Sequence, residues 1–162
     1  AQRSAYVEAV NHLTTGLELL KTLPDTPERT QQELTLRAAL IPALIFTRGY
    51  AAPEVGEACA RALELTRQAG ETPRLFRVLA ELWVFHLARA ELQKARELGE
   101  QLLTLAQRLQ NPSLLLMAHS AMGMSLFWLG ELGPARAHLE QVIALYDSQR
   151  HSSPCLLQLC PF

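Results

Sequence analysis

Valine, isoleucine, aromatic residues and cysteine are scarce in this 162-residue sequence. Val and Ile together number 9, against 32 Leu and 22 Ala. Because β-branched side chains favour strands whereas Leu and Ala favour helices, this composition argues against a sheet and predicts an all-α fold. The three cysteines form no regular disulfide framework, which is typical of a reducing compartment, so we expect the protein in the cytoplasm.

An excess of charge of one sign and long apolar runs are also missing. The 15 basic and 16 acidic residues leave a net charge of −1, which gives no long-range attraction to nucleic acid or anionic lipid. No apolar stretch is long enough to span a membrane, and the first residues lack the layout of a signal peptide. The motifs GxxxxGK[ST], HExxH and paired CxxC are absent. We therefore expect no enzyme activity and no cofactor, and no binding to nucleic acid or membranes.

What the sequence does contain is a series of helix-length segments separated by prolines. The spacing of apolar residues and the positions of Pro24, Pro27, Pro53, Pro73 and Pro112 indicate these boundaries. Helices are predicted at 4–23, 28–48, 54–69, 74–89, 92–109, 113–129 and 134–147. Pro42 is the exception, because it lies inside a helical run that it is expected to kink or to end early.

An internal repeat of about 40 residues organises these segments. Residues 89–95 and 129–135 share the pattern x-small-Glu-Leu-x-x-Ala, 40 positions apart. A lone helical hairpin cannot bury its apolar face, so such units are expected to stack on one another. We predict one domain over 1–150, followed by an irregular tail over 151–162. Its parts are a half unit at about 1–23 and hairpin units at 28–69, 74–109 and 113–147.

The run 121–135 resembles the tetratricopeptide-repeat (TPR) pattern. The match consists of Met122, Gly123, Leu126, Gly130 and Ala135. In the preceding unit, Trp83 stands where the pattern prefers glycine. HEAT-type repeats also have a period of about 40 residues, whereas TPR units usually have a shorter one. The short Gly/Ala hairpin turn nevertheless favours the TPR family.

This resemblance implies a fold and a class of function. The sequence is similar to the C-terminal helical arrays of bacterial adenylate/guanylate cyclase–ATPase signalling proteins. It implies a right-handed α-solenoid that serves as a protein-interaction scaffold or regulatory module within a larger signalling protein. The first segment looks like the second helix of a unit, so we expect a fragment of a longer protein. Uncapped solenoid ends also predict self-association.

TPR-like arrays bind peptides on the concave face lined by the first helix of each hairpin, which suggests a candidate groove. Helical spacing and the offset of the repeat select its members: Arg37, Leu44, Arg77, Val84, Met117, Ser120, Met124, Phe127 and Trp128. Arg37 and Arg77 at one side could receive a carboxylate. The plain alternative is that these side chains belong to the core or to ordinary solvated surface.

Two further hypotheses remain open. A small molecule could lodge among Trp83, Trp128 and the methionines, which would make the chain a ligand-sensing module. In the tail, His151, Cys155 and Cys160 form an H-x₃-C-x₄-C run, but a structural zinc site wants four ligands. We therefore predict no metal, and an apolar tail that packs on the last helix or stays disordered.

Overall fold

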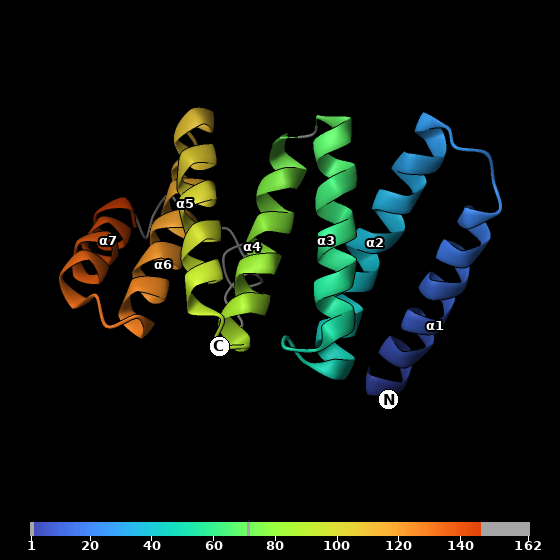
Figure 1. Cartoon of the computed structure of the whole chain (residues 1–162), viewed down its shortest axis with the longest axis horizontal. Helices are drawn as coiled ribbons and strands as arrows, with labels where there is room; N and C mark the ends of the chain where they lie inside the picture. Colours follow the sequence, from blue (N-terminus) through green and yellow to red (C-terminus); the bar gives the residue numbers. More distant parts are fainter. Residues whose placement is uncertain (1, 71, 147–162) are drawn as a thin grey trace. The chain divides into compact units, whose positions relative to one another are not determined.

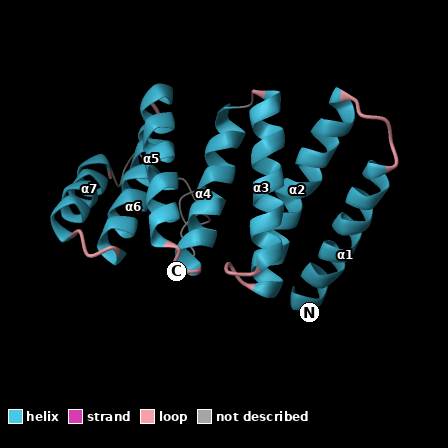
Figure 2. Ribbon diagram, in the orientation of Figure 1, coloured by secondary structure: helices cyan, strands magenta, loops and turns pink. Residues whose placement is uncertain are grey.

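The computed structural model describes residues 2–70 and 72–146, and this part of the chain contains seven helices and no strand (Figures 1 and 2). They are α1 (Gln2–Lys21), α2 (Pro27–Arg48), α3 (Pro53–Ala69), α4 (Thr72–Ala88), α5 (Leu92–Leu109), α6 (Pro112–Trp128) and α7 (Leu132–Leu145). Every predicted helix is present, and each end lies within two residues of its predicted position. The all-α class is therefore confirmed.

The helices fall into two compact units, Ala1–Glu91 and Leu92–Phe162. In unit 1, α1 packs on α2, α2 on α3 and α3 on α4, and neighbours run antiparallel (Figure 1). In unit 2, α6 packs against both α5 and α7. The boundary falls inside the stretch 74–109 that the repeat assigns to one hairpin. The predicted tail over 151–162 lies outside the described residues.

Side-chain caps explain where two of the helices begin. The hydroxyl oxygen of Thr26 accepts a hydrogen bond from the backbone N–H of Arg29 at 3.2 Å, and Pro27 occupies the first helical position. The side-chain oxygen of Asn111 accepts from the N–H groups of Ser113 and Leu114. Both caps satisfy donors that the first helical turn leaves unpaired. None of the described helices is both long and apolar enough to cross a membrane.

Pro42 does not end its helix. α2 continues through it to Arg48, so an early end at this proline was wrong. The proline removes the hydrogen bond that the Ala38 carbonyl would accept, but Ala38 is exposed and water can replace that bond. Close to the proline, Leu40, Ile41 and Leu44 are buried in the core, at 6%, 0% and 5% exposure. Their burial offsets the cost of a proline within the helix.

Left-handed backbone conformations mark the helix ends at a nearly constant interval. Positive φ angles occur at Gly49 (89°), Gly70 (69°), Ala90 (56°), Gln110 (48°) and Gly130 (81°). The positions from Gly70 to Gly130 are evenly spaced, and only the first step, from Gly49 to Gly70, is longer by a single position. The turns at Ala90 and Gly130 also share their hydrogen bonds: Glu91 N–H donates to the His86 carbonyl and Glu131 N–H to the Leu126 carbonyl, both at 2.9 Å. The repeat is thus present in the backbone itself.

Small residues allow close helix packing in unit 2. A Cβ built on Gly123 would lie 2.8 Å from Cδ2 of Leu139, so α7 presses against the bare backbone of α6. Ala95 and Ala135 are 0% and 2% exposed. The missing side chain at Gly123 therefore permits this close approach.

Candidate functional site

Four predicted groove residues lie in unit 1, and two of them are arginines that already hold carboxylates. The side chain of Arg37 donates to Glu33 at 2.8 Å and that of Arg77 to Glu81 at 3.4 Å, each one helical turn away. Leu44 is buried in the core, whereas Val84 is only half-buried. The structure therefore shows a core residue and two engaged cations at these positions.

Glu33 is the centre of an ion-pair network between α2 and α3. Its two carboxylate oxygens accept hydrogen bonds from Nε and Nη2 of Arg61, at 3.0 and 3.3 Å, in addition to the bond from Arg37. Burial alone raises the pKa of Glu33, but the bonds from Arg61 and Arg37 outweigh it and hold the pKa below its ordinary value. The bidentate geometry fits a contact that fixes the packing of two helices.

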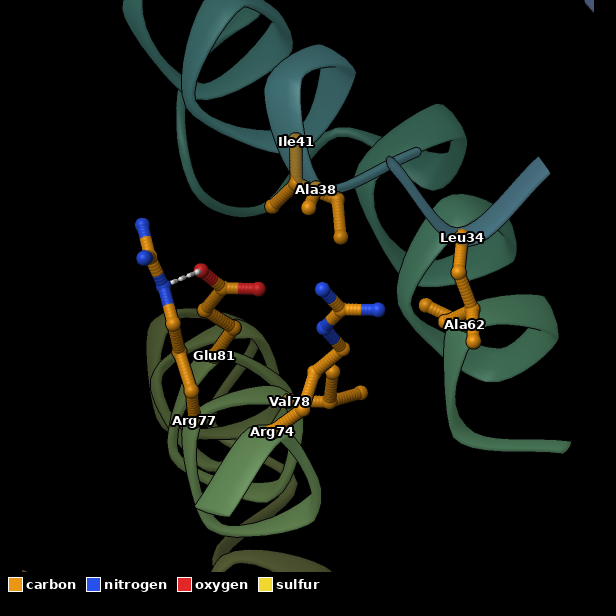
Figure 3. Close-up of a pocket in the computed structure, with 8 residues that line it drawn as sticks. All are labelled: Leu34, Ala38, Ile41, Ala62, Arg74, Arg77, Val78 and Glu81. Atoms are coloured by element: carbon orange, nitrogen blue, oxygen red, sulfur yellow. Dashed lines mark hydrogen bonds and ion pairs between the residues drawn. The ribbon is translucent and has the colours of Figure 1, made fainter. Parts of the chain in front are cut away.

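Arg77 and Glu81 also line a small cavity in unit 1 (Figure 3). The cavity has a volume of about 20 Å³, which is room for one water molecule. Its walls come from α2, α3 and α4 and consist of Leu34, Ala38, Ile41, Ala62, Arg74, Arg77, Val78 and Glu81. In Figure 3 the side chains of Arg74, Arg77 and Glu81 rise from the same helix toward the residues of α2. The cavity is therefore lined by a carboxyl group and two guanidinium groups as well as apolar side chains.

The chemistry around this cavity is that of a packed interior. Burial raises the pKa of Glu81, and the ion pair with Arg77 only partly opposes that rise. Cys59 is 0% exposed, and burial together with the Glu81 charge raises the pKa of its thiol. A buried thiol with a raised pKa is a poor nucleophile. Sequence reasoning missed Glu81, although a lone acid inside the apolar stretch of the predicted helix 74–89 was a usable signal.

The other five predicted groove residues lie on α6 in unit 2. Met117, Ser120 and Met124 are half-buried, and the Ser120 hydroxyl donates to the Leu116 carbonyl at 2.9 Å. Phe127 and Trp128 are 50% and 59% exposed. Their rings pack edge to face with centroids 5.5 Å apart. The structure thus presents an exposed aromatic pair at the end of α6.

A second set of exposed apolar side chains lies on α7 and directly after it, and sequence reasoning missed it. Leu132, Leu139, Ile143 and Tyr146 are 61%, 40%, 74% and 59% exposed. Spacings of seven and four place the Cα atoms of Leu132, Leu139 and Ile143 along one side of the helix, and Tyr146 directly follows its last residue. The repeat offered a signal that could have found this set. The residues equivalent to Leu139, Ile143 and Tyr146 in the preceding repeat are Gly99, Leu103 and Ala106, which lie on the α6-facing side of α5. We call the six residues from Phe127 to Tyr146 the unit-2 apolar surface: Phe127, Trp128, Leu132, Leu139, Ile143 and Tyr146.

The described residues hold no group of three or more His, Cys, Asp or Glu side chains that could bind a metal ion. The predicted run of His151, Cys155 and Cys160 lies outside the described residues.

No protein-family model matches the sequence, and no curated protein matches it either.

Proposed function

We propose that the chain is an interaction module that binds a protein or peptide through the unit-2 apolar surface. The observation that supports this proposal is the exposure of six large apolar side chains, three of them aromatic, between residues 127 and 146. Exposed apolar groups of this kind gain free energy when a partner removes them from water. Aromatic side chains are also the commonest anchors of protein interfaces.

The chemistry of the partner follows from the same surface. Arg37 and Arg77 are paired with Glu33 and Glu81, so a ligand carboxylate would have to compete with an existing ion pair. The unit-2 apolar surface imposes no such competition. We therefore propose a partner that presents apolar side chains, rather than one recognised by a terminal carboxylate.

We also propose an architecture for this module and a larger protein to which it belongs. Equivalent turns at Ala90 and Gly130 support hairpins that recur at a constant interval and stack as a right-handed TPR-like solenoid. The resemblance to cyclase–ATPase arrays supports a regulatory role within a larger bacterial signalling protein in the cytoplasm. A small-molecule sensor finds less support, because the unit-1 cavity of about 20 Å³ is far smaller than the hundreds of Å³ typical of ligand pockets.

The test is selection of peptides from a random library against the immobilised full chain, followed by titration of the selected peptides. Replacing both Phe127 and Trp128 by Ala should weaken binding at least about tenfold, because central aromatic anchors carry most of the energy of an interface. Leu19→Ala is the matched control, since Leu19 is 64% exposed but lies in unit 1. Circular dichroism should show intact helices in both variants. Equal binding by the parent and the double variant would contradict the proposal.

A further inference from the structure

Two histidines face each other across the α6–α7 hairpin of unit 2. Nδ1 of His119 lies 3.0 Å from Nδ1 of His138, and the two rings are partly buried. One ring donates its N–H to the other, so the accepting imidazole is neutral in this arrangement. Neither ring has another hydrogen-bond or ion-pair partner within the described part of the chain.

The repeat shows what these two positions hold elsewhere. One repeat earlier the equivalents of His119 and His138 are Leu79 and Leu98, which are 3% and 9% exposed. Both positions of the pair therefore hold a histidine where the preceding repeat holds a buried leucine. One N–H···N bond contributes only about 1 kcal/mol, whereas burying a leucine side chain contributes about 2 kcal/mol. Packing alone therefore does not explain why both positions hold histidine instead of leucine. Residues that depart from the pattern of their fold are often found at functional sites.

The geometry points to a cation: we propose that His119 and His138 bind a divalent transition-metal ion such as Zn²⁺ through their Nδ1 atoms. Two nitrogens at about 2.05 Å from a tetrahedral zinc lie about 3.3 Å apart, so the rings must separate by only a few tenths of an ångström. Imidazole nitrogen suits zinc, copper and nickel. Water fills the remaining coordination positions, which makes the site open and exchangeable rather than structural.

The local electrostatics suit this role. Burial lowers the pKa of both rings, and the charge of His138 lowers that of His119 further. The flanking charges on α7, Arg136 and Glu140, pair with each other at 2.7 Å. When the metal binds, the donor ring moves its proton from Nδ1 to Nε2. No proton is released, because both rings remain neutral tautomers.

The experiment is a zinc titration of the full chain, followed by calorimetry and by urea unfolding. The parent carries H151Q, C155S and C160S, which removes the only other closely spaced soft ligands in the sequence. Zinc at about 100 times its dissociation constant should raise the folding equilibrium constant of unit 2 about a hundredfold. The variant H119L/H138L places at each position the leucine that the preceding repeat holds there, and it should fold while losing this response.

Two controls make the outcome decisive. Replacing the exposed His12 of unit 1 by Gln should leave the zinc response unchanged, whereas H119L or H138L alone should weaken binding at least about tenfold. The proposal is overturned if the parent shows no binding up to about 1 mM zinc, or if H119L/H138L binds zinc as tightly as the parent.

Discussion

Replacing Gly56 by alanine tests the packing of α3 on α4 in unit 1. A Cβ at Gly56 would lie 2.5 Å from Cζ of Phe85 and within 3.0 Å of two further ring atoms. Phe85 is 8% exposed, so its ring has little room to retreat. Alanine gains about 1 kcal/mol over glycine in a helix interior, but overpacking a core costs about 1–3 kcal/mol. We expect a net destabilisation of about 1 kcal/mol, opposite in sign to the helix propensity.

Urea unfolding followed by Trp83 fluorescence measures this effect in unit 1, with Trp128 replaced by Phe to silence the second emitter. Gly16→Ala is the matched control in the same unit. There a Cβ meets only the tip of Leu36 at 3.2 Å, so the variant should be neutral or more stable. A shorter side chain at position 85 should recover part of the loss in Gly56→Ala, with a coupling of about 0.5 kcal/mol or more. Stabilisation by Gly56→Ala equal to that of the control would refute the proposed contact.

Three further predictions concern the turn at Ala90, the ion pairs of Glu33 and the histidine pair. Ala90→Gly should stabilise the chain by about 0.5–1 kcal/mol in thermal unfolding, because φ of 56° is unfavourable for any residue with a Cβ; an unchanged midpoint would contradict this. Glu33→Gln should destabilise unit 1 by about 1–2 kcal/mol at pH 7. Since the pKa of Glu33 is lowered, that difference should persist above about pH 4.5 and fade as the pH falls through the folded-state value; a constant difference would exclude the network. The lowered pKa values of His119 and His138 imply that unit 2 loses stability as the pH falls below about 6.5, and urea midpoints should show a weaker slope in H119L/H138L.

Helix positions could be predicted because several local signals agree. At the start of α2, Thr26 supplies a cap acceptor and Pro27 a preset φ angle, so side-chain chemistry and backbone geometry mark the same residue. Pro42 was harder to interpret, because a local rule predicts a kink or a break while the burial of Leu40 and Ile41 favours continuation. Its outcome depends on tertiary packing, which spacing alone does not reveal.

The candidate sites were less predictable, because exposure depends on what covers each helix. Helical spacing selected Phe127 and Trp128, which are exposed, but it also selected Leu44, which is buried. The exposed apolar side chains of α7 were not selected from the sequence, although the equivalents of three positions in the set lie on the α6-facing side of α5. The contact between His119 and His138 joins two helices across 19 positions of sequence, and neither position is unusual by itself. In the sequence, the one signal is that the equivalent positions of the preceding repeat hold Leu79 and Leu98 instead of histidines.

The even interval between left-handed residues has a consequence for how this protein tolerates changes of length. Each added residue turns an α-helix by about 100°, so one insertion between Gly70 and Gly130 would swing all later side chains of that helix out of phase with their neighbours. Insertions and deletions should therefore be accepted in the connection at 22–26 or near Gly49, where the interval is already irregular. Elsewhere, we expect the array to grow or shrink only by whole hairpins.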